Sequence, residues 1–416
     1  MNTFLARQPI FDRRLRVYAY ELLYRANANV NAAGLIVDAD QASSETILTG
    51  FSNIGIDRLT GGKRAFINFT AKLLESGVAT LFPKDHLVVE ILEDVPPTET
   101  ILHACRQLKE AGYTIALDDF SFRPEMLPFV EIADIIKVDF LADSIPNIRK
   151  QVEALKRPTP LLLAEKVETQ DVFDQARDMG CRLFQGYFFS KPLLLVEKKL
   201  DPLTVNIMHL IRLMNRSDIT FPRLARVVGR DVALSYRLLR LVNSAYFGMR
   251  HKIQDITHAL TILGMREVRK WISLLSMADL GQGKPDELIR MSLIRGRFLE
   301  IYALQNDKEL ESHLFFMAGL FSLLDVMMDI SMKDVLSQLS LPGFVSQSLT
   351  GNGLAAQLLK ALEAYEKSDW QTALTLSMAL DIDARQLIAN YLDALTWSDR
   401  FGEYARREES DADDNL

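Results

Sequence analysis

Cysteine is scarce in this chain, whose 416 residues include only Cys105 and Cys181. The two do not form a Cys-x-x-Cys pair, which argues against a zinc module or a disulfide scaffold. A single disulfide between them stays possible, but a chain long enough for two or three domains with sizeable cores does not need one. A reducing cytoplasm therefore fits, and we expect a cytoplasmic protein.

The sequence also lacks a long apolar run. Its most apolar stretch, Leu314 to Met328, is interrupted by Ser322 and Asp325, so it reads as a buried helix and not as a membrane span. Charged residues at Arg7 and Asp12 leave no room for the apolar region of a signal peptide. With 48% hydrophobic and 25% charged residues, the composition is typical of a soluble globular protein without membrane insertion.

Positive charge is in deficit, with 48 Lys and Arg against 55 Asp and Glu, a net charge of −7. Residues 201–270 are an exception, because they carry 12 basic and 5 acidic groups, whereas residues 271–407 carry 12 basic and 18 acidic groups. Few aromatic residues accompany the basic segment, which argues against nucleic acid as a partner. Solvated helix faces that pair with the acidic half or dock onto another domain are the favoured interpretation.

The first 200 residues alternate short apolar runs with helical patterns. The runs are 17–23, 65–69, 86–92, 113–117, 134–138, 160–164 and 183–188, and 4–9 supplies an eighth. Most are continuously apolar, as in strands that are buried on both faces. This alternation predicts an α/β fold, a TIM-like (β/α)8 barrel, with an open doubly wound sheet as the competitor. No Gly-x-Gly-x-x-Gly motif follows the first strand, which weakens a dinucleotide-binding interpretation.

After about residue 202 the strand-like runs stop and helical periodicity continues to about residue 400. We therefore predict a barrel over 1–200, an all-α domain over 201–400 and an acidic, disordered tail over 401–416. The last nine residues contain five acids and no base.

Polar side chains stand near the carboxyl ends of the predicted strands, where barrel enzymes place their functional groups. They are Glu21, Asn68, Glu90, Asp118, Asp119, Lys137, Glu165 and Gln185. Carboxylates gathered at one barrel mouth repel each other unless cations intervene, and hard oxygen ligands suit Mg²⁺ or Mn²⁺. Two such ions could clamp a phosphodiester, and a lysine could orient the water or relay a proton. A barrel with an acidic rim is the alternative.

Residues 20–25, which read YELLYR, open a series of motifs that resembles the EAL domain, a barrel that hydrolyses the second messenger cyclic di-GMP. The resemblance covers about residues 3–195 and continues through Asn68, EILE at 90–93, DDF at 118–120, IKVD at 136–139, AEKVE at 164–168 and QGYFFSKP at 185–192. It implies that the metal ligands are Glu21, Asn68, Glu90, Asp118 and Asp119. It also implies that Lys137, Glu165 and Gln185 hold or activate the water, and that Arg25 contacts the substrate.

Two departures from the EAL pattern bear on activity. The family's Gly-Thr-Gly-Tyr-Ser loop is replaced by residues 121–125, SFRPE, which lose two glycines and gain a proline. A family glycine is also replaced by Lys166, which places a cation beside Glu165. A metal site displaced by about 1 Å can lose on the order of 100-fold in rate, and binding tolerates such a shift better than catalysis. We therefore expect low or absent hydrolysis.

The helical half is similar to the HDOD domain, a relative of the HD metal-dependent phosphohydrolases, over about residues 203–395. The similarity is strongest over 220–275, which includes the helix 231–248 and the motifs ITHAL at 256–260 and ILG at 262–264. HD enzymes need a His-Asp pair and further histidines, whereas this chain has six histidines and no His-Asp dipeptide. His313 and Asp325 remain but do not make a dinuclear site, so we expect a non-catalytic module that binds a protein partner.

The sequence therefore favours a cyclic di-GMP signalling protein whose barrel binds or slowly hydrolyses the dinucleotide with Mg²⁺ or Mn²⁺. The alternative is a catalytically inactive scaffold or receptor that acts through protein–protein interaction. An HD-type phosphohydrolase is nearly excluded by the missing histidines.

Overall fold

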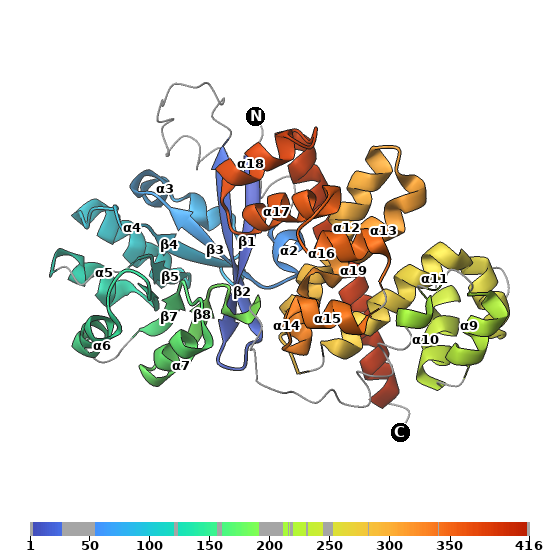
Figure 1. Cartoon of the computed structure of the whole chain (residues 1–416). Coiled ribbons are helices and arrows are strands. Elements are labelled where there is room, and N and C mark those ends of the chain that lie inside the picture. The colour runs from blue at the N-terminus through green and yellow to red at the C-terminus, as the bar shows by residue number, and fades with distance from the viewer. Residues whose placement is uncertain are drawn as a thin grey trace. The chain divides into compact units, whose positions relative to one another are not determined.

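The computed structural model describes residues 3–26, 55–119, 124–155, 160–190, 211–214, 216, 219–229, 232–243, 253–281, 283–339 and 341–413. Its first part is a closed barrel in the order β1 to β8 (Figure 1), which confirms the predicted barrel and excludes the open sheet. The strands are β1 (Thr3–Asp12), β2 (Val17–Ala26), β3 (Arg64–Phe69), β4 (Leu87–Ile91), β5 (Thr114–Leu117), β6 (Ile135–Asp139), β7 (Leu161–Glu165) and β8 (Leu183–Gln185).

Helices lie outside these strands, as Figure 1 shows for α3 to α7. They are α2 (Ile56–Thr60), α3 (Ala71–Ser76), α4 (Glu99–Glu110), α5 (Leu127–Ile132), α6 (Ile145–Ala154) and α7 (Gln170–Asp178). Two of them begin at threonine N-caps, where the side chains of Thr98 and Thr169 accept hydrogen bonds from the backbone of Ile101 and Val172. Such caps satisfy otherwise unpaired backbone donors and fix where a helix starts after its strand.

β1 departs from a regular (β/α)8 pattern because it runs antiparallel to both β2 and β8. The turn between Asp12 and Val17 explains this direction, since a parallel neighbour needs a crossover of about a dozen residues. Asp12 stabilises the turn, with its side chain accepting hydrogen bonds from the backbone N–H groups of Arg14 and Arg16 at 2.8 and 3.0 Å. The remaining barrel pairs are parallel.

An apolar layer fills the barrel below its mouth, and each strand contributes one buried side chain to it. In strand order the layer is Ile10, Ala19, Phe66, Val88, Ala116, Ile135, Leu163 and Leu183. None is more than 2% exposed, so the barrel interior is packed and is not a channel. This layer provides the floor on which the polar side chains of the mouth rest.

The C-terminal helices divide between two compact units. The first unit contains residues 1–191 and 361–399, and the second contains residues 192–360 and 400–416. Residues 361–399, part of the helical domain predicted over 201–400, group with the barrel in this division. Tyr365 makes this attachment, because its buried hydroxyl donates a 2.6 Å hydrogen bond to the carbonyl of Leu5 in β1. Tyr187 also donates to the carbonyl of Glu366, at 2.5 Å.

The second unit is helical throughout its described elements, in agreement with the predicted all-α fold. Its helices include α9 (Phe221–Val228), α10 (Val232–Val242), α11 (Ile256–Leu280), α12 (Asp286–Gln305), α13 (Ser312–Leu320), α14 (Leu324–Met328), α15 (Met332–Gln338) and α16 (Gly343–Leu349). Three further helices lie wholly or partly in residues 361–399 of the first unit, α17 (Leu354–Glu366), α18 (Trp370–Met378) and α19 (Ala384–Asp413). The last of these extends helix into the tail that the sequence predicts to be disordered.

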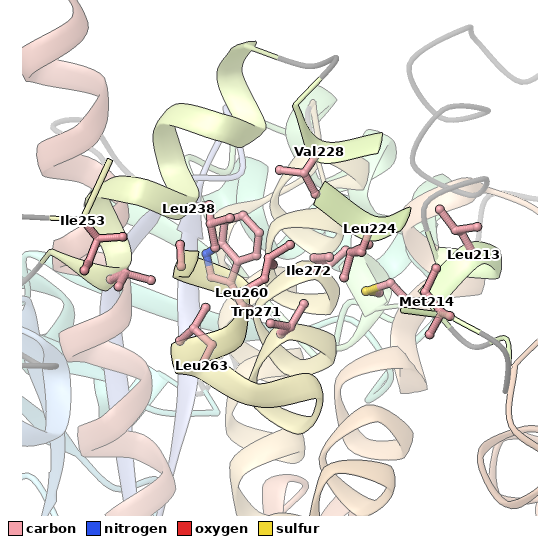
Figure 2. Close-up of a cluster of buried hydrophobic side chains, with 14 residues drawn as sticks. Leu213, Met214, Leu224, Val228, Leu238, Ile253, Leu260, Leu263, Trp271 and Ile272 are labelled. Carbon is pink, nitrogen blue, oxygen red and sulfur yellow. The ribbon is translucent and has the colours of Figure 1, made fainter. Parts of the chain in front are cut away.

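A hydrophobic cluster around Trp271 holds α9, α10 and α11 together (Figure 2). Leu224, Leu238 and Leu260, one from each helix, are fully buried in it. α11 bends at Gly264, whose φ of 74° is a conformation that glycine adopts at little cost. Within this unit Lys270 pairs with Glu300 at 2.7 Å, so part of the basic segment pairs with the acidic half as expected.

Asn243 ties the end of α10 to the start of the segment that leads into α11. Its amide nitrogen donates to the carbonyls of Leu239 and Ile253 at 2.7 and 2.8 Å, and its oxygen accepts from the N–H of Ile253 at 2.7 Å. We expect Asn243→Ala to lower the free energy of unfolding by about 1–3 kcal/mol, because the carbonyl and the N–H of Ile253 lose their partner, whereas the Leu239 carbonyl keeps the backbone N–H of residue 243. Urea unfolding followed by circular dichroism measures this change. The exposed Asn352→Ala is the control, with an expected change within about 0.5 kcal/mol; equal costs for the two variants would contradict the prediction.

The structure also bears on the two cysteines and on the most apolar stretch of the sequence. Cys105 and Cys181 are free, buried thiols, and burial raises their pKa to about 11 and about 12. Among the described residues, one helical stretch, Glu309–Met328, is long and apolar enough to cross a membrane by composition, and 67% of it is buried inside the fold. Such burial is equally typical of a core helix.

Candidate functional site

A polar ring lies on the apolar floor of the barrel, two residues away from it on each strand. Because successive side chains of a strand alternate between its faces, a step of two keeps the side chain inside the barrel. From the apolar layer this step leads to Gln8, Glu21, Asn68, Glu90, Asp118, Lys137, Glu165 and Gln185. Seven of these eight are residues predicted from the sequence, and the barrel brings all seven to one mouth.

Lys137 pairs with four carboxylates at this mouth, although it is only 1% exposed. Its Nζ lies 2.8 Å from an oxygen of Asp118, 2.8 Å from Glu165 and 3.5 Å from Glu21, and it also contacts Glu90. These four carboxylates come from four different strands or strand ends. A buried ammonium is stable only with such partners, so Lys137 and the acids depend on each other.

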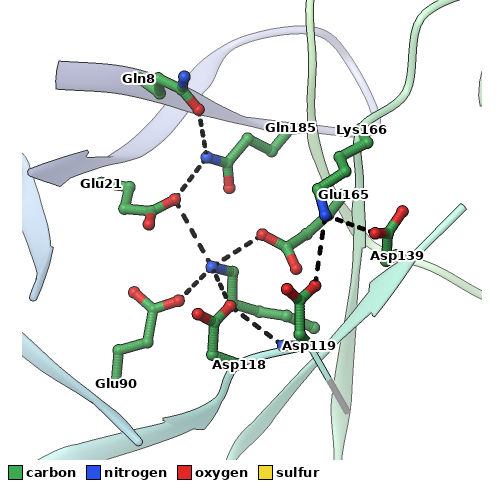
Figure 3. Close-up of polar contacts among 10 residues, drawn as sticks. Gln8, Glu21, Glu90, Asp118, Asp119, Asp139, Glu165, Lys166 and Gln185 are labelled. Carbon is green, nitrogen blue, oxygen red and sulfur yellow. Dashed lines mark hydrogen bonds and ion pairs between the residues drawn. The ribbon is translucent and has the colours of Figure 1, made fainter. Parts of the chain in front are cut away.

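Gln185, on β8, connects the last strand of the barrel with the first two. Its amide nitrogen donates to Glu21 at 2.6 Å and to the side-chain oxygen of Gln8 at 3.0 Å (Figure 3). Gln8 is a member of the ring that the sequence did not predict. The signal that could have found it is the short turn after Asp12, which makes β1 antiparallel and reverses the direction of the two-residue step from Ile10. In the hairpin register Gln8 then lies directly opposite Glu21.

The electrostatics of the ring show an excess of buried negative charge. Burial raises the pKa of Glu90 well above its ordinary value, and it raises the pKa of Glu165 to about 8, although Lys137 opposes both shifts. Burial lowers the pKa of Lys137, but the surrounding carboxylates outweigh it and raise that pKa well above the usual range. A single ammonium is therefore too little charge to balance this ring, which favours additional cations.

Two of the carboxylates that pair with Lys137, Asp118 and Glu165, also form a group with Asp119 that meets the requirements of a cation site. Asp118, Asp119 and Glu165 each place an oxygen within 4.8 Å of the others. The Oε2 atoms of Glu90 and Glu165 and the Oδ1 atom of Asp119 are buried without a hydrogen-bond partner. Hard oxygen atoms in this arrangement suit a divalent cation such as Mg²⁺ or Mn²⁺, so the residues present fit the group that the sequence implies.

The backbone beside this cation site is strained at two non-glycine residues. Asp119 has a φ of 38°, and Lys166, which follows β7, has a φ of 53°. L-residues rarely adopt this left-handed region, and such strain is concentrated at functional sites. Lys166 extends to Asp139, with 2.5 Å between Nζ and Oδ2, and lies 3.7 Å from Asp119 (Figure 3). The ammonium that departs from the EAL pattern therefore faces the acids of the site.

Two sequence predictions fall outside these described contacts. Arg25 lies in β2, but its side chain is outside the described residues, as are residues 120–123 of the altered loop. In the helical unit, His313 is half-buried in α13, where burial lowers its pKa. Within the described part of that unit, no group of three His, Cys, Asp or Glu residues brings its ligand atoms together.

Comparisons with known proteins agree with both halves of the chain. The family model described as the EAL domain matches residues 2–192, and the HDOD domain matches residues 200–341. A Bacillus subtilis protein, the uncharacterized protein YuxH, is 36% identical over 95% of this chain and 98% of its own length. The chain belongs to the EAL–HDOD family.

Another EAL–HDOD relative is the cyclic di-GMP phosphodiesterase CdgJ of Vibrio cholerae, which is 34% identical over 95% of this chain and 92% of its own length. Among solved structures, the Bacillus subtilis YkuI protein, which has an EAL domain and was solved with cyclic di-GMP and calcium, is 19% identical. It covers 55% of this chain and 72% of its own, with a TM-score of 0.38. The family membership of this EAL–HDOD protein rests on the family models and the full-length relatives.

Proposed function

We propose that the barrel binds cyclic di-GMP and hydrolyses it slowly with Mg²⁺ or Mn²⁺. The observation that carries this proposal is the ring of carboxylates whose buried Oε2 atoms on Glu90 and Glu165 lack a partner. Six acids surround the mouth, Glu21, Glu90, Asp118, Asp119, Asp139 and Glu165, and they face two lysines. The formal balance is four negative charges, which two divalent cations neutralise before an anionic dinucleotide enters. The name of the relative CdgJ supports the same substrate.

Glu21, Asn68, Glu90, Asp118 and Asp119 would hold the cations, which would supply a Lewis acid for the phosphodiester and lower the pKa of the attacking water. Lys137 keeps the carboxylates of Glu90, Asp118 and Glu165 in place from inside the ring, and Gln185 fixes Glu21 through a 2.6 Å hydrogen bond. Glu165 and the buried Oε1 of Gln185 are free to accept protons or hydrogen bonds from the water. Arg25 contacts a substrate phosphate.

The rate is low in this proposal because the surroundings of Asp119 differ from the EAL pattern. The loop that follows contains Pro124, and Lys166 places a positive charge 3.7 Å from Asp119. Both changes affect the position or the charge of a cation ligand, and a misplacement of about 1 Å can lower a rate on the order of 100-fold. The affinity for cyclic di-GMP depends less on the exact position of a cation ligand than the rate of hydrolysis does, because the rate requires the geometry of the transition state.

The HDOD half acts in this proposal as a non-catalytic module that carries the barrel's output to a protein partner. The support for this module is its polarised charge, with 12 basic and 5 acidic groups over 201–270 against 12 basic and 18 acidic groups over 271–407, together with helix patterning. The histidine set of an HD enzyme is missing, since the chain has six histidines and no His-Asp pair. A cytoplasmic location is part of the same proposal.

The second candidate function is a receptor that binds cyclic di-GMP without hydrolysing it. The contact between Lys166 and Asp119 favours it, because an ammonium already pairs with a predicted cation ligand. Calorimetric titration of cyclic di-GMP with Ca²⁺, followed by a hydrolysis assay with Mg²⁺ or Mn²⁺, separates the two. Turnover identifies an enzyme, binding without turnover identifies a receptor, and the lack of both leaves a scaffold.

Glu21→Gln tests the enzyme directly, because it keeps the shape of the side chain and removes its charge. We expect hydrolysis in Mn²⁺ to fall by about 100-fold or more, since one anionic cation ligand and the acceptor for Gln185 and Lys137 are weakened. The exposed Glu110→Gln, on the outer helix α4, is the matched control and should keep the parent rate. Parent-like turnover of the Glu21 variant would rule out this site for the reaction.

A further inference from the structure

Lys166 stands at the outer side of the carboxylate ring, where it contacts a residue of each of two neighbouring strand ends. Its Nζ is 2.5 Å from Oδ2 of Asp139, which ends β6, and 3.7 Å from Oδ1 of Asp119, which follows β5. The side chain is 49% exposed, so the ammonium reaches from solvent toward the site (Figure 3). Lys137, by contrast, lies inside the ring and is 1% exposed.

The Oδ1 atom that faces Lys166 also belongs to the candidate cation site. It is buried and has no hydrogen-bond partner, and the distance of 3.7 Å to the ammonium is an ion-pair distance but is too long for a hydrogen bond. Asp119 shares that site with Asp118 and with Glu165, which is 7% exposed and has an unpartnered Oε2. A cation held by these three carboxylates and the ammonium of Lys166 would therefore compete for the same aspartate.

We propose that Lys166 sets the affinity of the divalent cation that Asp118, Asp119 and Glu165 would hold, here called the outer cation, by competing with it for Asp119. This inference rests on the proposed function. Two like charges that share one carboxylate repel each other, so the outer cation binds only as the ammonium moves away from Asp119. The second cation of the proposed function, here called the inner cation, would be held by Glu21 and Glu90 and is affected less, because neither glutamate is a contact of Lys166 in the described ion pairs. Lys166 thus determines how many cations the site holds, because it favours the state with one bound cation over the state with two.

The test is a Mn²⁺ titration of the full chain, with free Mn²⁺ measured by electron paramagnetic resonance. We expect one tighter and one weaker Mn²⁺ in the parent protein. Lys166→Met keeps the length of the side chain and a non-glycine backbone, and we expect it to tighten the weaker ion about tenfold by removing a like charge. Lys166→Arg keeps the charge and should retain the parent isotherm. Lys109→Met removes a half-exposed lysine that pairs with Asp134 outside the mouth, and it should also leave the isotherm unchanged.

Unchanged Mn²⁺ binding in Lys166→Met, or equal tightening in Lys109→Met, would overturn the inference. If the methionine variant does not fold, Lys166→Gln tests the same loss of charge. Turnover tests the proposed function separately: parent turnover of cyclic di-GMP with an unchanged Lys166→Met isotherm upholds the enzyme and rejects the role of Lys166, whereas a tightened isotherm without turnover does the reverse. Absence of Mn²⁺ binding from every variant would overturn both.

Discussion

Lys137→Met is expected to lower the free energy of unfolding of the metal-free protein by about 3–5 kcal/mol at pH 8. The reason is that Lys137 contacts Glu21, Glu90, Asp118 and Glu165 while it is itself buried. Removing one partner from a buried charge network leaves the other charges uncompensated, which costs more than the pair contributes. Methionine fills a similar volume, so the loss reports charge and not a cavity.

The pH dependence of this variant has a definite sign. Burial raises the pKa of Glu90 and Glu165 in the folded state, so the folded protein binds more protons than the unfolded chain above the ordinary glutamate pKa. The free energy of unfolding therefore falls as pH rises. For Glu165 in the parent protein, this fall extends from about pH 4.5, the ordinary glutamate pKa, to about pH 8, its pKa in the folded state. Lys137 lowers both pKa values, so its removal extends the fall to higher pH. We expect the variant to lose least stability near pH 5.

Urea unfolding in EDTA at pH 5 and pH 8 measures both the size and the sign of this effect. Lys109→Met is the matched control, because this half-exposed ion pair with Asp134 should contribute less than about 1 kcal/mol at either pH. Added Mn²⁺ should restore part of the stability of the Lys137 variant, since a ligand that binds only the folded state stabilises it. A cost below 1 kcal/mol at pH 8 would show that the four carboxylates do not need the ammonium.

Gly186→Ala is expected to disrupt the site, because the added methyl group would collide with the backbone of Val167. Gly186 directly follows Gln185, has a φ of 146°, and comes so close to Val167 that an added Cβ would lie 2.1 Å from its carbonyl oxygen and 2.5 Å from its nitrogen. That contact is backbone against backbone, so no side-chain rotation relieves it. The Val167 N–H donates to Gln185 at 3.0 Å, and the Val167 carbonyl accepts from Phe188 at 3.2 Å. Both hydrogen bonds would have to shift.

These bonds align the loops that carry Glu165 and Gln185, so we expect a loss of about 2–4 kcal/mol in stability and a fall of about 100-fold or more in the cyclic di-GMP hydrolysis that we propose. Gly180→Ala is the matched control: its φ is 101°, but an added Cβ meets nothing within 4 Å. It should show the cost of backbone strain alone, about 1–2 kcal/mol, with parent-like activity. Thermal unfolding and the Mn²⁺ assay compare the two. Equal losses in both variants would mean that strain, and not the contact with Val167, sets the cost.

Most of the polar ring could be predicted from the sequence because it depends on local spacing. A buried strand of five residues keeps every second side chain inside the barrel, so Phe66 predicts the orientation of Asn68, and Val88 that of Glu90. Gln8 was not predicted because β1 is antiparallel, so the ring residue of this strand lies two positions before Ile10 and not two positions after it. The strand direction is set by the turn at Asp12, and its consequence for the ring appears only once β1 closes the barrel against β8.

The residue types and strand periodicity of this EAL–HDOD protein determined by themselves the barrel, the helical second half and seven members of the polar ring. The tertiary structure alone decided which groups meet: Lys137 with four carboxylates, Lys166 with Asp119 and Asp139, and Tyr365 with Leu5 across 360 positions of sequence. The physical reason is that periodicity fixes the direction of a side chain within one strand. Contacts between strands depend on register and burial, which the whole barrel sets at once.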